Sequence, residues 1–263
     1  MFDPDLPDPA EPAEPTGAAR RFPPLPVLAR GDGWIVVAKP PLVIVHRNPK
    51  MPHVPAVLQR VRTMVGERVY LAHRLDRGAS GCLLLATRQE LAGALSAAVT
   101  SPLAQKTYLA FVRGDCLREG PFRVETPIPS DYGPKEAAST VQVLGHTPEP
   151  RCSLLRVQPE TGRHHQVRRH VRDVNHPIIG DADHGDSRIN RWWREQHGLN
   201  RLGLHCMRLV LPLPDGQTLD VTCPLFEDQA LLFRQLPWWE QARAAEPALD
   251  LPPLSMDWVG QVT

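Results

Sequence analysis

The sequence contains no apolar run of the roughly 18 residues that a transmembrane helix needs. Cysteine is scarce: five residues are scattered along the chain, without a Cys-x-x-Cys pair. An odd and unclustered set argues against a disulfide framework and a zinc ribbon, and it favours reduced thiols in the cytoplasm. There is also no phosphate-binding P-loop and no Gly-x-Gly-x-x-Gly turn between a strand and a helix. The membrane, disulfide-rich and nucleotide-fingerprint classes are therefore not expected.

Lysine is also scarce, with 4 Lys against 26 Arg. The net charge is only +1, but the charges are distributed unevenly along the chain. Residues 1–16 carry five acids and no base, which leaves +6 on the rest of the chain. Arginine binds phosphate through paired hydrogen bonds and stacks on bases, so its excess suits RNA. A codon bias toward Arg and Ala would explain the same counts, and both interpretations stay open.

The length of 263 residues fits one large domain or two small ones. Residues 1–22 are acidic and Pro-rich, and we expect a disordered tail there rather than a signal peptide. Residues 23–236 are expected to form the main domain. From Pro237 the chain turns Pro- and Ala-rich, which predicts a loose C-terminal extension over residues 237–263.

Hydrophobic periodicity predicts a mixture of strands and helices. Strands or extended runs are expected at 34–38, 42–45, 83–86, 105–113, 141–144, 153–157, 204–211 and 218–223. Helices are expected at 54–65, 90–99, 165–173 and 227–235. Because strands and helices do not alternate regularly, the pattern favours an α+β fold with a largely antiparallel sheet.

The segment His-Arg-Leu-Asp-Arg-Gly-Ala-Ser-Gly at 73–81 carries the clearest chemical signal. Asp76 lies between Arg74 and Arg77, directly after the apolar run 69–72. Nearby positive charge favours the ionised form of a carboxyl group. An ionised carboxylate at a strand end suits a nucleophile or a general base. An ordinary surface salt bridge at a turn is the structural alternative.

This segment resembles the signature of the RluA-type pseudouridine synthases, which have Thr at the position of Ala79. The resemblance continues in order at Lys-Thr-Tyr (106–108), Thr-Gly-Arg-His-His-Gln-Val-Arg (161–168) and Leu-His-Cys (204–206). It implies the pseudouridine synthase fold, with a mixed, largely antiparallel sheet and a central active-site cleft, and makes residues 23–236 the catalytic domain. It also implies isomerisation of uridine in RNA, which needs neither a metal nor a redox cofactor.

The resemblance implies catalytic roles for three residues. Asp76 matches the indispensable carboxylate, as nucleophile or general base. Tyr108 shares a strand face with Lys106 and Ala110, and its ring is expected to stack on the base while its hydroxyl accepts or relays the C5 proton. Arg168 matches the arginine that pairs with the catalytic aspartate and keeps it charged. A core tyrosine remains the alternative for Tyr108.

Further residues are expected to bind the substrate. Val167 matches an apolar position that packs on the opposite side of the base, with a core valine as the alternative. Arg163 and Arg169 are expected to contact phosphates. Arg74 resembles an arginine that other members insert where the base has left the stack, with a surface charge as the alternative. Arg77, beside Asp76, completes the predicted substrate-binding set.

The region after this motif bears on the substrate. The segment 176–186, with the later Asn190-Arg191, resembles a subgroup that acts on tRNA, which implies uridine 65 as the target. Ribosomal RNA is the alternative substrate, and a non-catalytic RNA-binding protein is the alternative of another class. The expected partner is therefore tRNA rather than DNA or a membrane. A cytoplasmic monomer is expected.

Two clusters allow more than one interpretation. Residues 188–201 carry four arginines and two tryptophans, typical either of an RNA-contacting loop or of a helix that packs its tryptophans on the core. A histidine and aspartate cluster suggests a metal-dependent hydrolase, but His165 and His170 are five residues apart rather than four, and no Glu lies between them. No metal is expected, and hydrogen bonding within a basic RNA-facing surface is the predicted role. The members of this cluster are His164, His165, His170, His176, Asp181, Asp183 and His184.

Overall fold

A computed structural model describes residues 23–46 and 56–256 of the chain. Its strands are β1 (Val27–Gly31), β2 (Trp34–Lys39), β3 (Tyr70–Leu71), β4 (Ser80–Ala86), β5 (Gln105–Arg113), β6 (Phe122–Val124), β7 (Ser139–Pro148), β8 (Arg151–Pro159), β9 (Leu204–Pro212) and β10 (Thr218–Thr222). Its helices are α1 (Val57–Val65), α2 (Gln89–Thr100), α3 (Gln166–Asp173), α4 (Ser187–His197), α5 (Glu227–Phe233), α6 (Trp239–Ala245) and the 3-10 helix η1 (Pro247–Asp250). The expected tail at 1–22, the first residues of the helix expected at 54–65, and residues 257–263 lie outside the described part.

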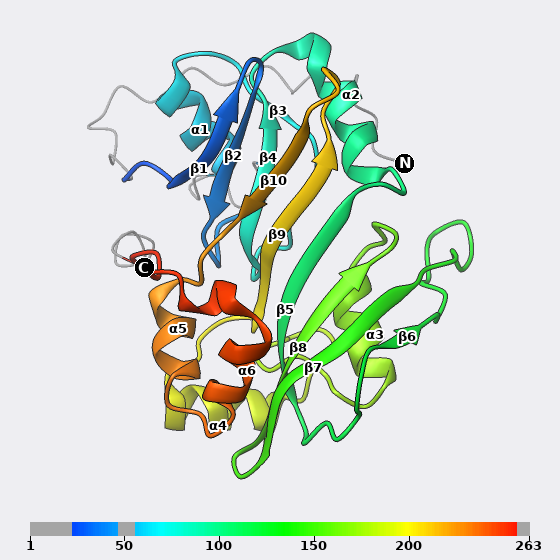
Figure 1. The fold of residues 1–263 in the computed structure, drawn as a ribbon, viewed down its shortest axis with the longest axis vertical. Helices are drawn as coiled ribbons and strands as arrows, with labels where there is room; N and C mark the ends of the chain where they lie inside the picture. Colours follow the sequence, from blue (N-terminus) through cyan, green and yellow to red (C-terminus); the bar gives the residue numbers. More distant parts are fainter. Residues whose placement is uncertain (1–22, 47–55, 257–263) are drawn as a thin grey trace.

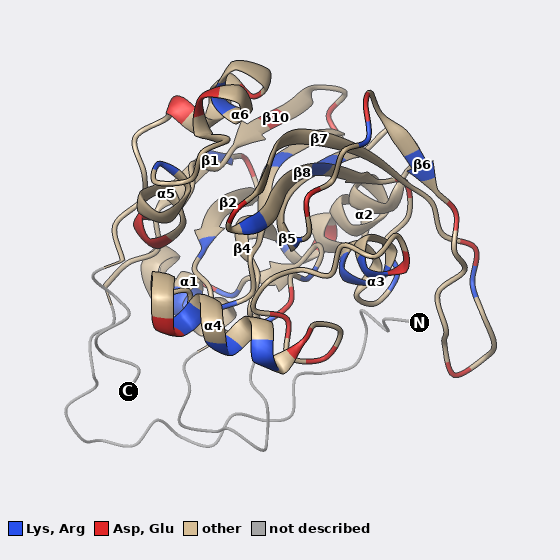
Figure 2. Cartoon of the chain, turned by 90° about the horizontal axis from the view of Figure 1, so that it is seen from below, with Lys and Arg blue, Asp and Glu red and all other residues tan. Residues whose placement is uncertain are grey.

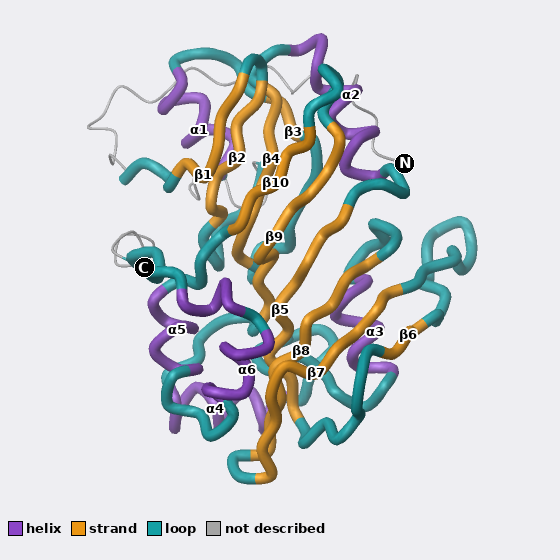
Figure 3. The backbone as a smooth tube through the Cα atoms, viewed as in Figure 1, coloured by secondary structure: helices purple, strands orange, loops and turns teal. Residues whose placement is uncertain are grey.

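One sheet of ten strands runs through the described residues, as Figures 1 and 3 show. Its order is β1-β2-β4-β9-β5-β8-β7-β6, with β10 also paired to β9 and β3 to β4. β4 and β9 pair in parallel, whereas the other strand pairs are antiparallel. The mixed, largely antiparallel sheet and the α+β class predicted from the sequence are confirmed.

Alternation along β5 divides the core into two faces, because successive side chains of a strand point to opposite sides. Ala110 and Val112 pack in one cluster with Val171 of α3. Phe111 packs on the other face against Trp193 of α4, with 4.9 Å between ring centroids, and against Trp238. Helix α3 therefore covers one face of this half of the sheet, and α4 to α6 cover the other. No helix within 23–46 and 56–256 has the length and apolar character needed to cross a bilayer.

The run at 42–45 is not a strand, contrary to prediction. Its carbonyl oxygens instead accept hydrogen bonds from the first backbone amides of α1. Ile44 O accepts from Val57 N at 2.9 Å, and Val45 O accepts from Leu58 N at 3.0 Å. Helix α1 has no side-chain cap at Ala56, so these carbonyls satisfy amides that have no partner within the helix. The segment caps a helix here rather than adding to the sheet.

The expectation of a loose extension from Pro237 is wrong for residues 238–250. Trp238 is 2% exposed and Leu249 is 4% exposed, and both belong to the hydrophobic cluster around Phe111. The Pro and Ala content suggested little structure, but the tryptophans supply apolar area that is buried on the sheet. The segment forms α6 and η1 and is part of the core.

Residues 187–197 form a helix rather than a loop. The Asp186 side chain caps α4 by accepting hydrogen bonds from Arg188 N and Ile189 N at 2.9 and 3.3 Å, as expected of an aspartate at this position. Trp193 is buried against the core, whereas Trp192 is 41% exposed. The packing interpretation therefore holds for Trp193, while Trp192 remains accessible to a ligand.

Candidate active site

Asp76 lies in the loop between β3 and β4, and a fully buried lysine holds this loop from behind. Lys39 Nζ donates hydrogen bonds to Ala79 O at 2.7 Å, to Pro40 O at 2.8 Å and to Arg77 O at 3.2 Å. Burial lowers the pKa of Lys39 well below its ordinary value, nearby arginines lower it further, and Asp76 raises it. Through its three hydrogen bonds, the Lys39 side chain fixes the backbone of the loop that carries Asp76.

The end of the loop is anchored by a buried polar network. A turn ends the loop, with Ala79 N donating to Asp76 O at 3.1 Å. Ser80 Oγ accepts from Arg201 Nη1 at 2.9 Å and lies 2.8 Å from His205 Nδ1. His205 Nε2 lies 3.0 Å from Cys223 O, which can only accept, so Nδ1 is the acceptor for the Ser80 hydroxyl. Burial lowers the pKa of His205 to about 4, which keeps the ring neutral.

Strand β9 brings the Asp76 loop and Tyr108 together. Cys206 of β9 pairs with Gly81 of β4 on one side and with Tyr108 of β5 on the other. A Cβ atom at Gly81 would lie 2.2 Å from Cys206 O, and the backbone of Gly81 has φ +119°. This close parallel approach requires glycine. Cys206 is itself fully buried.

Arg168 of α3 gathers three carboxylates around one guanidinium. Its Nε and Nη2 bind the two oxygens of Asp181 at 2.8 and 2.6 Å, and Nη2 also binds Asp183 Oδ2 at 2.7 Å. Its Nη1 donates to Asp76 Oδ2 at 3.1 Å. Burial lowers the pKa of Arg168, but Asp181, Asp183 and Asp76 raise it above its ordinary value. The predicted contact between Arg168 and Asp76 is present.

The two arginines that flank Asp76 in the sequence do not pair with it. Arg77 Nε donates to Leu42 O at 3.2 Å, and Arg74 is exposed. In the described residues, the arginine that pairs with Asp76 is Arg168, 92 positions along the chain. The local interpretation of Asp76 as an acid held by its neighbours was therefore wrong about the partner.

Tyr108 is half-buried beside Asp76. Burial raises its pKa well above the ordinary value, and the neighbouring Cys206 and Asp76 raise it further. The phenol is therefore neutral and can donate a proton or a hydrogen bond. A bulge places Met207 of β9 without a partner between Thr107 and Tyr108, which locally changes the direction of the strand.

The predicted substrate-binding residues around α3 differ in exposure. Val167 is 5% exposed and packs in a cluster with Ala79, as the core alternative expects. Arg163 is exposed, and its Nε donates to Glu136 O at 3.1 Å. Arg169 is half-buried, and its Nε has no hydrogen-bond partner among the described residues. Arg163 thus remains available to an anion outside the protein.

The histidine and aspartate cluster divides into separate contacts. His170 lies 2.9 Å from Ser139 Oγ and 3.0 Å from Thr126 O, and His176 bonds to the backbone of Arg113. The rings of His164 and His184 both contact His165, whose Nε2 lies 3.9 Å from Asp76 Oδ1. Within the described ranges, no three His, Cys, Asp or Glu side chains are grouped so that they could hold a metal ion.

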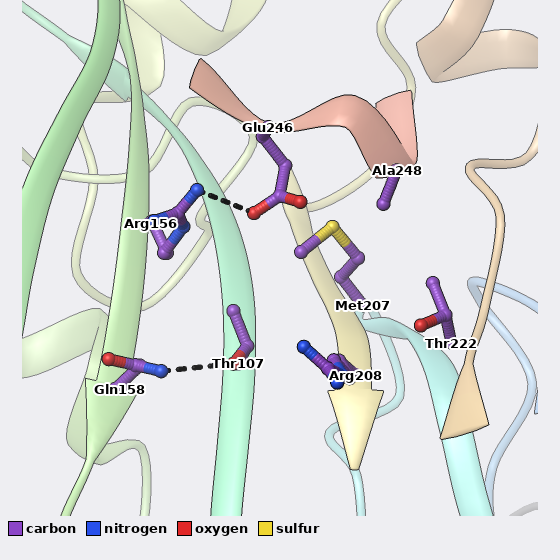
Figure 4. Close-up of a pocket in the computed structure, with 8 residues that line it drawn as sticks. All are labelled: Thr107, Arg156, Gln158, Met207, Arg208, Thr222, Glu246 and Ala248. Atoms are coloured by element: carbon purple, nitrogen blue, oxygen red, sulfur yellow. Dashed lines mark hydrogen bonds and ion pairs between the residues drawn. The ribbon is translucent and has the colours of Figure 1, made fainter. Parts of the chain in front are cut away.

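A groove of about 250 Å³ lies on the face of the sheet opposite α3, and Figure 4 shows the residues that line it. Thr107 of β5 and Gln158 of β8 line it, one position away from residues that face α3. Its charges are matched one to one, by Arg156 with Glu246 at 2.7 Å and by Arg208 with Asp220 at 2.5 Å. It contains none of the predicted site residues, so it is separate from the site around Asp76.

Sequence reasoning missed two residues that build the site. Lys39 looked like the end of a strand before Pro40, and its signal was a lone lysine closing an apolar run. Asp181 was noted only as part of a polar cluster, although it anchors Arg168 and is 1% exposed. A buried aspartate near a motif arginine is a recognisable signal, but the pairing itself depends on the fold.

Basic residues outside the Asp76 loop are concentrated on α4, whose ribbon in Figure 2 carries several blue segments, all of them arginine. Arg188, Arg191 and Arg194 are exposed and form no ion pair within the described part of the chain. Trp192 lies among them with 41% exposure. This helix therefore presents free cations and an aromatic ring to solvent.

Comparison with known proteins gives a consistent set of relatives. Residues 33–173 match the family model described as RNA pseudouridylate synthase. The chain is 38% identical over 217 residues to tRNA pseudouridine synthase C of Pectobacterium carotovorum subsp. carotovorum, an alignment that covers 74% of this chain but only 57% of that protein. It is 35% identical over 235 residues to tRNA pseudouridine synthase C of Yersinia pestis, covering 81% and 91% of the two chains.

Solved structures support the fold. Human RNA Pseudouridylate Synthase Domain Containing 1 superposes with a TM-score of 0.64 at 22% identity, over 87% of this chain and 96% of that chain. Human RNA Pseudouridylate Synthase Domain Containing 4 gives a TM-score of 0.60 at 21% identity, over 87% and 95%. At this identity the likeness concerns the arrangement of the elements in Figure 1.

Proposed function

The chain belongs to the RNA pseudouridylate synthase family, and from that premise we propose that it isomerises a specific uridine in tRNA to pseudouridine with Asp76 as the catalytic carboxylate. The observation that carries this proposal is the hydrogen bond from Arg168 Nη1 to Asp76 Oδ2 at 3.1 Å, on an arginine that is 6% exposed. The names of the relatives support tRNA as the substrate. Uridine 65 is the proposed position, on the strength of the motif resemblance at 176–186.

The reaction breaks the bond between uracil N1 and ribose C1′, turns the base and joins C5 to C1′. N1 gains a proton and C5 loses one, so nothing is consumed or released. Asp76 either attacks the sugar or abstracts a proton, and both routes need a carboxylate anion beside C1′. Arg168 stabilises that anion, and the neutral phenol of Tyr108 is suited to stack on the base and to relay a proton to or from it.

The RNA is proposed to extend from this site across exposed basic side chains. Arg188, Arg191 and Arg194 on α4 have no carboxylate partner in the described residues, and Trp192 offers a ring on which a base can stack. Arg74, Arg77 and Arg163 are exposed nearer the motif segments. Contacts of this kind release counterions, so affinity should fall steeply as salt rises.

The experiment is site-resolved mapping of pseudouridine in unmodified tRNA and ribosomal RNA incubated with the purified chain. Asp76→Asn should lower turnover by roughly three orders of magnitude or more, with tRNA affinity changed by less than about tenfold, since the phosphate contacts remain. Asp220→Asn, an exposed aspartate on the opposite face, serves as the matched control and should retain activity.

The outcomes separate the parts of the proposal. Pseudouridine at tRNA position 65 with the wild type and Asp220→Asn, but not with Asp76→Asn, supports it in full. Modification of ribosomal RNA alone retains the chemistry and rejects the substrate. Full activity of Asp76→Asn rejects the assignment of the carboxylate, and binding without modification of any RNA favours a non-catalytic RNA-binding protein.

A cytoplasmic location and a monomeric state complete the proposal. All five cysteines, including Cys152 and Cys223, are free and buried, as suits a reducing compartment. Sedimentation of the purified chain should give one species near 29.3 kDa. A species of twice that mass, stable on dilution, would reject the monomer.

A further inference from the structure

His165 occupies an unusual position beside the site. It precedes α3 with a left-handed backbone, φ 55° and ψ 26°, a conformation that is uncommon for residues other than glycine and in which Asn, Asp and His are enriched. Glycine or asparagine would fit this backbone more easily. The imidazole ring, rather than the backbone, is therefore the feature that needs an explanation.

The ring of His165 lies between Asp76 and a second histidine. Its Nδ1 is 2.9 Å from His184 Nε2, and its Nε2 is 3.9 Å from Asp76 Oδ1. His164 stacks on it, with 3.7 Å between ring centroids. Arg168 holds the other oxygen of Asp76, at 3.1 Å. The two oxygens of the carboxylate thus face two different side chains, Arg168 at 3.1 Å and His165 at 3.9 Å.

His184 is itself fixed by the residue that anchors Arg168. Its backbone N–H donates to Asp181 Oδ1 at 3.0 Å, and Asp181 binds Arg168 through both oxygens. Asp181 therefore holds two groups that both approach Asp76. The first is the Arg168 guanidinium, and the second is the pair of histidines His184 and His165.

The proton arrangement of the pair follows from its surroundings. Burial lowers the pKa of His165 to about 4, with Asp76 opposing and Arg168, His164 and His184 adding to the shift. The pKa of His184 is also lowered, first by burial. Each ring therefore carries one N–H at neutral pH. A carboxylate favours the N–H at His165 Nε2, which leaves Nδ1 to accept from His184 Nε2–H.

We propose that His184 is a positioning residue for the isomerisation: it fixes the tautomer of His165, whose Nε2–H then orients the free oxygen of Asp76. This inference rests on the proposed function. The 3.9 Å separation is longer than a hydrogen bond, and catalytic contacts of this kind commonly shorten when the substrate is bound. Without the His184 donor, His165 can adopt the other tautomer. Its unprotonated Nε2 lone pair then faces the Asp76 carboxylate and repels it.

The test compares two replacements of His184. His184→Phe keeps a ring but removes the donor, and the single-turnover rate of pseudouridine formation should fall roughly ten- to a hundredfold, as for other residues that orient a functional ligand. The Kd for tRNA and the melting temperature should stay at wild-type values. His184→Gln restores an N–H donor and should recover most of the rate. His146→Gln, at the pair with Asp115, is the matched control and should be fully active.

Each result decides the matter. A wild-type rate in His184→Phe overturns the inference, and so does a His184→Gln variant as slow as His184→Phe. A rate loss that accompanies weaker tRNA binding and a lower melting temperature indicates a merely structural role and also overturns it. A wild-type chain that modifies no RNA overturns the proposed function together with this inference, whereas an active wild type confines any failure to His184.

A measurement on the unmodified protein removes the dependence on folding of the variants. Long-range ¹H–¹⁵N spectra distinguish a protonated from a bare ring nitrogen. We expect His165 Nε2 to be protonated and Nδ1 to be bare at neutral pH. The opposite tautomer in the wild-type protein would contradict the inference directly.

Discussion

The two faces of β5 and β8 use arginine and carboxylate in opposite ways. In the groove of Figure 4, Arg156 and Arg208 each have one carboxylate, and the Arg208–Asp220 pair is half exposed. On the α3 face, one arginine with 7% of its side chain exposed serves Asp76, Asp181 and Asp183. Matched surface pairs contribute little, whereas a buried cation with several anions fixes a geometry. Chemistry is therefore expected on the face where one buried arginine serves several carboxylates.

The largest effect should come from removing the buried cation. Arg168→Met leaves Asp181, which is 1% exposed, without its partner, and the free energy of unfolding should fall by about 3–5 kcal/mol. Pseudouridine formation should be lost together with it. Urea unfolding and a single-turnover assay measure both. Unchanged stability would show that the three carboxylates do not depend on Arg168.

The next effect is a loss of folding stability in acid. The pKa values of His73, His165 and His205 are lowered to about 4 by burial. Because the unfolded rings take up protons near pH 6.5 and the folded rings do not, the free energy of unfolding should fall as the pH drops from 6.5 toward 4. Each ring contributes at most about 1.4 kcal/mol per pH unit. Urea unfolding at pH 7 and pH 5 measures the loss, and equal midpoints would contradict it.

Removing the Lys39 hydrogen-bond donor from the loop that carries Asp76 should have a smaller effect. Lys39→Met leaves the carbonyls of Arg77 and Ala79 without their donor. We expect about 1–3 kcal/mol of destabilisation and a slower single-turnover rate, because the loop carries Asp76. A variant that loses stability but keeps the full rate would show that the loop backbone orients itself.

The smallest effect should lie on the opposite face. Arg208→Gln breaks an ion pair whose side chains are 49% and 46% exposed, so the free energy of unfolding should change by no more than about 1 kcal/mol. Activity on tRNA should remain that of the wild type. A large loss of activity would place function in the groove and reverse the comparison of the two faces.

The sequence predicted those parts of the molecule that depend on near neighbours. Alternation placed β5 at 105–113, as the structure has it, and helical spacing placed α3 within one residue. The motif resemblance also predicted the contact between Arg168 and Asp76. Local arginines next to Asp76 suggested the wrong partner, because their side chains turn elsewhere.

Other features depend on contacts that no local pattern contains. Lys39 reaches the carbonyl of Ala79 across 40 positions. Trp238 directly follows Pro237, where composition suggested a loose extension, but it packs on Phe111. The run at 42–45 has strand-like composition, yet its carbonyls are used by α1. In each case tertiary packing decides the structure that composition leaves open.

The parallel pairing of β4 with β9 also determines when the site can form. Ser80 and His205 meet there although 125 positions separate them. Contacts of such high sequence separation form late, because a long loop must close before they are gained. During synthesis, the segment that bears Asp76 emerges well before β9 exists. A nascent chain that ends before residue 204 therefore lacks the strand with which Gly81 pairs, and the site around Asp76 cannot be completed until β9 has been synthesised.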